Sequence, residues 1–307
     1  MNFIYYIKQL WYNYQKGSGE FVEVSHYKNK ELYEKFRAQW EKFREDLGKG
    51  KFKFNDTNEA MKYPFLKLLN MFIQLKMNRE ITLEEIKKYY ILCRATKINK
   101  DEDIDKISYD RFLPKEEYIQ NHNRFSPKGV EYLYLACDLN FYVYYTTVEK
   151  ISIKEIRAKN KDIVGLCKFE INENSIGDND KIIDLSFVDS KSFQDIINEY
   201  SQDVKKRILK YLEKESISDK IFDGVFIRPV SEIYFKILSS ELFKPIENCE
   251  KKNQYAPFHC MAYYFNELGY VGIKYKSTVW NGETGSNIVL FNKNKAIPIE
   301  YKIINNI

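Results

Sequence analysis

The spacing of the apolar residues changes near residue 89 of this chain, and this change limits the possible folds. Apolar residues recur at intervals of four and three before it, at Leu32, Phe36, Trp40, Phe43 and Leu47. This spacing predicts an amphipathic helix over residues 30–47, which Gly48 can end. A second helix is predicted over 57–77. A third begins at the sequence TLEE, where Thr82 and Glu85 can form a capping box.

From about residue 89 onward, short runs rich in β-branched and aromatic residues are separated by charged loops. Strands are predicted at YLYLAC, DIVGLCKFEI, GVFIRP, GYVGIKYKS, SNIVLF and AIPIEYK, near residues 132, 164, 226, 273, 289 and 299. Helices are predicted between some of them, over 192–214, 230–243 and 256–269. Strands and helices do not alternate strictly, which favours an α+β fold. We expect a helical N-terminal domain over 1–88 and a mixed β core with surrounding helices over 89–307.

Composition excludes several classes of protein. Lysine and arginine number 49 against 44 acidic residues, and the formal net charge of +5 is spread along the chain. No basic run is interleaved with aromatic residues, so no nucleic-acid groove is predicted. No segment approaches the ~20 apolar residues that span a bilayer, and the first residues lack the apolar run of a secretory signal. We expect a cytoplasmic protein that binds neither nucleic acid nor membrane.

Motifs of several common enzymes are absent from the sequence. It contains no GxGxxG, no GxxxxGK[ST], no GxSxG and no HExxH. The five cysteines form no CxxC pair, which argues against a disulfide framework and a zinc site and predicts buried free thiols. His259 and Cys260 are adjacent on a predicted helix and would point in different directions, so they do not predict a catalytic pair. We expect no metal.

Arg124 stands just before a proline and glycine turn in RFSPKGVEYLYLACD, and a strand with tyrosines at alternate positions follows the turn. A guanidinium offers a planar fork of donors that suits paired phosphate oxygens. An exposed arginine is often simply solvated, however. The residues alone leave both interpretations of Arg124 open.

Three tracts of the sequence together resemble the RES domain family. They are RFSPKGVEYLYLACD, KEIRAKNKDIVGLCKFEI and YAPFHCMAYYFNELGYVGIKYKSTVWNGETGSNIVLFNKNKAI. The resemblance implies a fold of ADP-ribosyltransferase type and NAD+ as the substrate. Family members cleave the bond between nicotinamide and ribose. Many are toxins of bacterial toxin–antitoxin pairs that deplete NAD+ by hydrolysis or phosphorolysis, and some instead ADP-ribosylate a protein.

The resemblance therefore implies that NAD+ and an antitoxin protein are partners, and it implies nothing about the oligomeric state. Two alternatives stay open: a protein ADP-ribosyltransferase, and a catalytically inactive nucleotide-binding module.

The family's name comes from an arginine, a glutamate and a serine, which the resemblance matches to Arg124, Glu155 and Ser277. Ser277 would position the ribose or the glutamate, with Thr278 as the neighbouring alternative. Ligand-binding roles are implied for Arg94 on the phosphates and for Tyr134, whose ring could stack on a base. Asn287 would support the loop between the last strands or contact the ligand.

The position of the glutamate depends on an insertion. In the family, the glutamate usually follows the tyrosine at a shorter distance than the one from Tyr134 to Glu155. At that shorter distance this chain has Tyr145 and not a glutamate. Placing an insertion in LNFYVYYTTVEKIS brings Glu155 into register, and Glu149 is the alternative.

Overall fold

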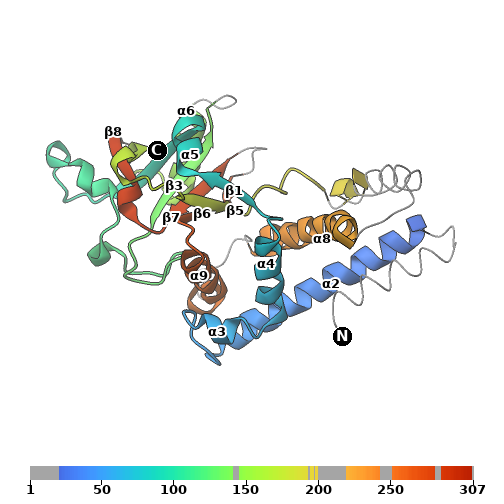
Figure 1. Ribbon diagram of the computed structural model, residues 1–307. Coiled ribbons are helices and arrows are strands. Elements are labelled where there is room, and N and C mark those ends of the chain that lie inside the picture. The colour runs from blue at the N-terminus through green and yellow to red at the C-terminus, as the bar shows by residue number, and fades with distance from the viewer. Residues whose placement is uncertain are drawn as a thin grey trace.

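The computed structural model of the protein describes residues 21–140, 145–192, 194–196, 198–199, 219–242, 251–280 and 285–305. The helices are α2 (Phe21–Gly48), α3 (Thr57–Ala60), α4 (Pro64–Gln74), α5 (Leu83–Tyr89), α6 (Tyr145–Glu155), α8 (Asp219–Leu242) and α9 (Lys251–Glu267). Short 3-10 helices lie at Ile104–Lys106, Tyr109–Phe112, Glu116–Tyr118, Glu173–Ser175 and Lys293–Lys295. Figure 1 shows a sheet at one end of the molecule and the long helices α2 and α8 at the other.

The strands form one mixed sheet. They are β1 (Arg79–Thr82), β2 (Tyr90–Ile98), β3 (Leu133–Leu139), β4 (Ile163–Ile171), β5 (Lys181–Asp184), β6 (Gly272–Lys276), β7 (Ser286–Leu290) and β8 (Ala296–Ile304). Their order in the sheet is β1-β5-β6-β7-β3-β2-β4-β8. Only β5 and β6 run parallel among these strands, and the other neighbours are antiparallel. The predicted α+β class is confirmed.

Helices cover both faces of the sheet. On one face, Val148 and Ile151 of α6 pack on Ala95 of β2 and Ala136 of β3. Farther along the same face, α9 lies against β6. On the other face, α5 packs through Leu83 and the neighbouring Ile86 into a second core. Because the central strands are buried on both sides, their apolar runs are nearly continuous and do not alternate with polar residues.

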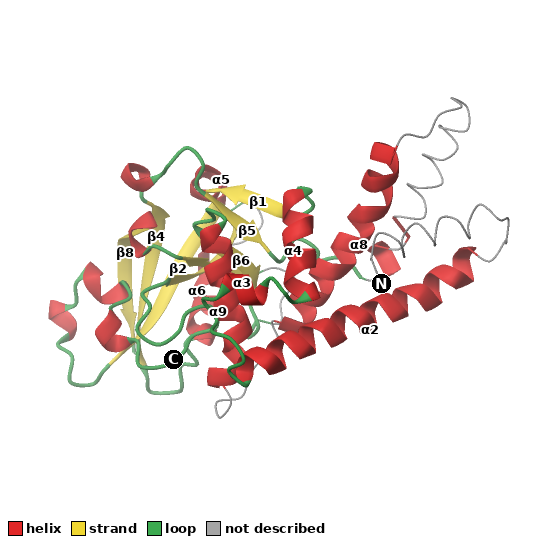
Figure 2. Ribbon diagram, turned by 60° about the horizontal axis from the view of Figure 1, so that its bottom comes forward, coloured by secondary structure: helices red, strands yellow, loops and turns green. Residues whose placement is uncertain are grey.

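The N-terminal helices share one hydrophobic core with the helices of the second half of the chain. Phe43 of α2, Phe65 of α4, Tyr234 of α8 and Phe265 of α9 are fully buried in it. The Tyr234 hydroxyl donates a hydrogen bond to the Phe65 carbonyl oxygen at 2.9 Å. Figure 2 shows these helices grouped beside the sheet. The expected division between residues 88 and 89 falls before the last residue of α5, just ahead of β2. The division into two domains stays a prediction.

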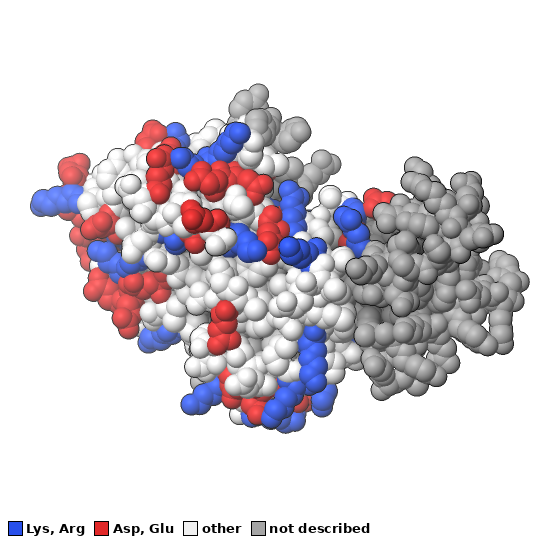
Figure 3. Space-filling view, in the orientation of Figure 1, with Lys and Arg blue, Asp and Glu red and all other residues white. Residues whose placement is uncertain are grey.

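Several local predictions are confirmed. The helix expected over 30–47 lies within α2, and the capping box forms. The Glu85 amide donates to the Thr82 hydroxyl at 3.1 Å, while the Thr82 amide donates to the Glu85 carboxylate at 2.8 Å. Basic and acidic side chains are interspersed over the described surface in Figure 3, in keeping with their even distribution along the sequence.

The single helix predicted over 57–77 is wrong, because α3 and α4 are separate helices. Pro64 occupies the first turn of α4, and Tyr63 before it has an extended backbone with φ −80° and ψ 130°. A residue before proline is driven out of the helical region by contact with the proline ring, and proline has no amide hydrogen to continue a helix. Apolar periodicity on both sides of Pro64 concealed this break.

The strand predicted at GVFIRP, near residue 226, is also wrong, because these residues belong to α8. A short apolar run fits a buried helix as well as a strand, and the helical pattern of residues 230–242 continues backward through it. The strands β1, β2 and β5 were not among the runs predicted as strands. The strands β1 and β5 have four residues each, and runs this short become strands only through pairing with neighbours. Most of the helix expected over 192–214 lies outside the described residues.

Candidate active site

The sheet opens where β2 and β3 part. The pairing of these two strands runs from Tyr90 opposite Leu139 to Cys93 opposite Ala136. Beyond that point β2 continues on β4 alone, while β3 continues on β7 alone. A cavity of about 410 Å³ lies at this parting, a size typical of small-molecule sites. Side chains of α6, α9, β6, β7 and the long loop between β2 and β3 complete its wall.

Glu155 lies in this wall at the last position of α6. Its Oε1 accepts one hydrogen bond from the Ser277 hydroxyl and one from the Asn287 side-chain amide, each at 2.6 Å. Both donors are buried. Neither of these two bonds involves Oε2.

The place of Glu155 on its helix is electrostatically unfavourable. The C-terminal end of a helix carries partial negative charge, where a cation is favoured over an anion by about 0.3–1 kcal/mol. Ser277 and Asn287 offset this cost with hydrogen bonds to the charged oxygen. A carboxylate kept in a locally unfavourable position by dedicated partners is typical of functional sites.

Arg124 is held by a tight loop. The Asn123 amide donates to the Ser126 carbonyl oxygen at 2.9 Å, which closes the loop around Arg124. The Tyr134 hydroxyl accepts from the Phe125 amide at 3.1 Å and lies 3.0 Å from the Ser126 hydroxyl. Burial raises the pKa of Tyr134, so the phenol stays neutral. The tyrosine on the strand thus anchors the loop that carries the arginine.

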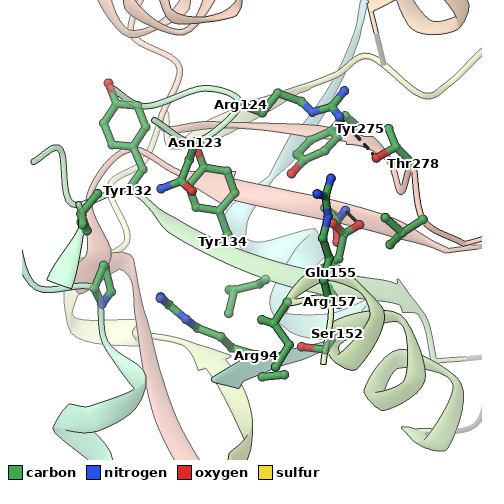
Figure 4. A pocket seen from close by; sticks show the side chains of 18 of the residues that line it. Arg94, Asn123, Arg124, Tyr132, Tyr134, Ser152, Glu155, Arg157, Tyr275 and Thr278 are labelled. Atoms are coloured by element: carbon green, nitrogen blue, oxygen red, sulfur yellow. Dashed lines mark hydrogen bonds between the residues drawn. The ribbon is translucent and has the colours of Figure 1, made fainter. Parts of the chain in front are cut away.

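The guanidinium of Arg124 reaches across the cavity wall. Its Nη2 donates to the Thr278 hydroxyl at 3.3 Å, and its Cζ lies 5.6 Å from the ring centre of Phe258. Figure 4 shows Arg124 and Thr278 on one side of the cavity and Glu155 near them. Ser277 therefore contacts the glutamate, whereas its neighbour Thr278 contacts the arginine.

Arg94 lies at the first position of β2 beyond the parting, and its side chain lines the cavity. Burial lowers its pKa to about 10, so it stays cationic at neutral pH. Its Nη1 is buried and has no hydrogen-bond partner among the described residues. A buried donor without a partner costs about 1–3 kcal/mol, which a bound anion could recover.

All six residues singled out in the sequence meet around this one cavity. Five of them line it, namely Arg94, Arg124, Tyr134, Glu155 and Asn287, and Ser277 is bonded to the glutamate. Glu149, the alternative glutamate, is buried elsewhere on α6 and pairs with Lys302 of β8 at 2.6 Å. The structure therefore brings Glu155, and not Glu149, to the cavity.

Arg157 also lines the cavity, and sequence reasoning did not single it out. Figure 4 shows it beside Glu155. Its backbone is left-handed, with φ 50°, which is uncommon for a residue other than glycine. Strain of this kind gathers at functional sites. The sequence signal was the charged stretch KEIRAK, in which Arg157 stands two positions after Glu155, the last residue of α6.

Charge in the lining is predominantly positive. Among the described lining residues, Arg94, Arg124 and Arg157 are cationic and Glu155 is the acidic one. Such a cavity favours a ligand that carries more than one negative charge. Beside these charges, the single carboxylate can stabilise a positively charged group of the ligand.

His259 and the described cysteine thiols do not supply reactive groups to this cavity. His259 is buried, its Nε2 lies 2.9 Å from the Asn123 carbonyl oxygen, and burial lowers its pKa to about 4. Burial raises the pKa of Cys260 to about 12, so the two do not form an activated pair. Cys93, Cys137, Cys167 and Cys260 are buried free thiols, while Cys249 lies outside the described residues.

Comparisons with protein-family models, with curated proteins and with solved structures found no match. Within the described ranges, no three histidine, cysteine or acidic side chains gather as a metal ion would require. None of the described helices is both long and apolar enough to cross a membrane.

Proposed function

We propose that this protein is an NAD+-consuming enzyme that cleaves the bond between nicotinamide and ribose, with the cytoplasmic pool as its substrate. The observation that carries the proposal is the orientation of Glu155, whose Oε1 is fixed by Ser277 and Asn287 inside a cavity rich in arginine. The resemblance to the RES family supports the same assignment.

The chemistry needs one carboxylate near the sugar. When neutral nicotinamide leaves, positive charge develops at the anomeric carbon of the ribose, as in glycoside hydrolysis. A fixed carboxylate stabilises that charge without reorganising. With Oε1 engaged by Ser277 and Asn287, Oε2 would accept a hydrogen bond from a ribose hydroxyl or orient the nucleophile. Arg94 and Arg124 would hold the phosphates.

Release of nicotinamide from NAD+ by the purified protein tests this proposal. We expect nicotinamide to accumulate, and Glu155→Gln to lower the rate by at least about a hundredfold because the amide keeps the shape but lacks the charge. Glu149→Gln is the matched control on the same helix and should retain activity. Absence of free nicotinamide, with or without added phosphate, would contradict the enzyme assignment and favour an inactive binding module.

The acceptor of the ADP-ribosyl group is a separate question. NAD+ labelled in its adenine distinguishes the outcomes, because hydrolysis or phosphorolysis leaves the protein fraction unlabelled, whereas a protein ADP-ribosyltransferase labels its target. We propose the first outcome. A toxin of this kind would lower cellular NAD+ on expression, unless an antitoxin protein covers the cavity.

A further inference from the structure

A second cavity of about 240 Å³ adjoins the first. The two share Arg94, Pro114, Ile119 and Asn123 in their walls. The second lies within the long loop between β2 and β3, and two 3-10 helices of this loop, Tyr109–Phe112 and Glu116–Tyr118, contribute side chains to its wall. Small-molecule sites usually measure about 300–1,000 Å³. The second cavity is smaller than this range, so by itself it suits one part of a ligand whose other part occupies the first cavity.

The wall of the second cavity contains an aromatic ring open to solvent. Tyr118 is 66% exposed, and the Cζ of Arg111 lies 5.7 Å from its ring centre. Arg111 is itself fixed, because it donates to Glu102 at 2.7 and 3.0 Å and to the Lys97 carbonyl oxygen at 2.8 Å. An exposed ring beside a cavity, steadied by a fixed guanidinium, is suited to stacking with a planar base.

Two amide side chains share the cavity wall with this ring. Gln120 and Asn121 line the same cavity, and the Gln120 side-chain amide donates to the Glu117 carbonyl oxygen at 2.6 Å. Asparagine and glutamine side chains carry both donors and acceptors, and they pair well with the edge of adenine. The wall therefore combines stacking and hydrogen-bonding groups of the kind that recognise a purine.

Arg94 lines both cavities, and its Nη1 is buried without a hydrogen-bond partner among the described residues. An anionic group between the cavities would satisfy this donor. In a dinucleotide, the pyrophosphate lies between the two nucleosides. One guanidinium at the junction thus matches the position of the charge in such a ligand.

We infer that the second cavity binds the adenosine half of the substrate, so that this enzyme selects complete dinucleotides over nicotinamide mononucleotide. This inference rests on the proposed function, in which the Glu155 cavity holds the nicotinamide ribose. Tyr118 stacks with the adenine and Arg94 holds the pyrophosphate. The mononucleotide fills only the first cavity.

The test compares nicotinamide release from NAD+ and from nicotinamide mononucleotide. Tyr118→Ala should lower kcat/KM for NAD+ by about tenfold or more, the usual effect of losing one stacked base, and leave that for the mononucleotide unchanged. Tyr118→Phe keeps the ring and should retain NAD+ activity. Tyr109→Ala removes another exposed tyrosine, outside both cavity walls, and serves as the control. Equal kcat/KM of the wild type for the two substrates would overturn the inference.

Binding separates this inference from the proposed function. Calorimetric titration with ADP-ribose needs no turnover, and we expect binding that Tyr118→Ala weakens by a similar factor. If neither substrate is cleaved but this pattern holds, the adenosine site stands and the proposed function fails. Cleavage of NAD+ that Tyr118→Ala does not affect, or ADP-ribose binding that it leaves unchanged, would refute the adenosine site.

Discussion

At the scale of single residues, the candidate site is a glutamate that two polar side chains hold by the same oxygen. Ser277 and Asn287 are 122 and 132 positions from Glu155 in the sequence, and both reach Oε1. A carboxylate bound in this way loses rotational freedom before any ligand arrives. Its other oxygen is therefore oriented in advance, which is the condition for electrostatic stabilisation of a short-lived cation.

We expect Ser277→Ala and Asn287→Ala each to lower kcat for nicotinamide release by about tenfold or more. Each removes one of the two hydrogen bonds to a charged oxygen, and such bonds contribute about 1.5–3 kcal/mol. KM should change little, because neither side chain is assigned to the phosphates. Steady-state kinetics on NAD+ measures both constants.

Thr278→Ala is the matched comparison, since its hydroxyl binds Arg124 and not Glu155. This variant should raise KM more than it lowers kcat. The opposite pattern in the two variants would show that the roles of Ser277 and Thr278 have been exchanged.

At the scale of elements, α9 holds the loop that carries Arg124. His259 of α9 lies 2.9 Å from the Asn123 carbonyl oxygen, and its ring stacks on His122 with centres 5.6 Å apart. Phe258 packs against Phe125 of the same loop. The α9 helix thus fixes one wall of the cavity, while α6 supplies the carboxylate on another.

This contact predicts a pH dependence of stability. Burial lowers the pKa of His259 from 6.5 to about 4, so below pH 6.5 the unfolded chain binds a proton that the folded chain does not. Stability due to His259 is therefore complete above pH 6.5 and falls by about 3 kcal/mol toward pH 4. Denaturant titrations between pH 4 and pH 7 measure this change.

His259→Gln is the control for this prediction, because glutamine can still donate to the Asn123 carbonyl oxygen but does not titrate. The free energy of unfolding of this variant should depend less steeply on pH than that of the wild type. Equal slopes for the two proteins over this interval would contradict the assignment.

At the scale of the whole molecule, one core joins the helices to the sheet. Trp40 of α2 is 3% exposed, and its ring centre lies 5.0 Å from that of Phe65 and 6.0 Å from that of Phe258. Ile273 and Val289 of the sheet belong to the same core. The N-terminal helices therefore stabilise α9, and through α9 the Arg124 loop.

We expect Trp40→Ala to lower the free energy of unfolding by about 3–5 kcal/mol, the usual cost of removing a large buried ring. Because the core is shared, sheet and helices should unfold in one transition, measured by circular dichroism and by loss of nicotinamide release. Leu75→Ala, at a position 41% exposed, should have a much smaller effect. Loss of helix in Trp40→Ala with the activity unchanged would indicate that the two parts fold independently.

The sequence by itself determined the local features of this protein. Four-and-three spacing specified the part of α2 over 30–47, the pair Thr82 and Glu85 specified a cap, and β-rich runs specified most of the sheet. The resemblance to a family also named the residues that meet in the cavity. These features depend on neighbours within a few positions, which any chain with this pattern shares.

Only the tertiary structure decided where the cavity opens, that Glu155 and not Glu149 reaches it, and that Arg157 joins the wall. These outcomes depend on strand register and on the end of α6, which bring together residues more than a hundred positions apart. A shift of one residue in register would turn such side chains to the opposite face of the sheet. Local spacing carries no information about that choice, because it is settled by packing between segments distant in the sequence.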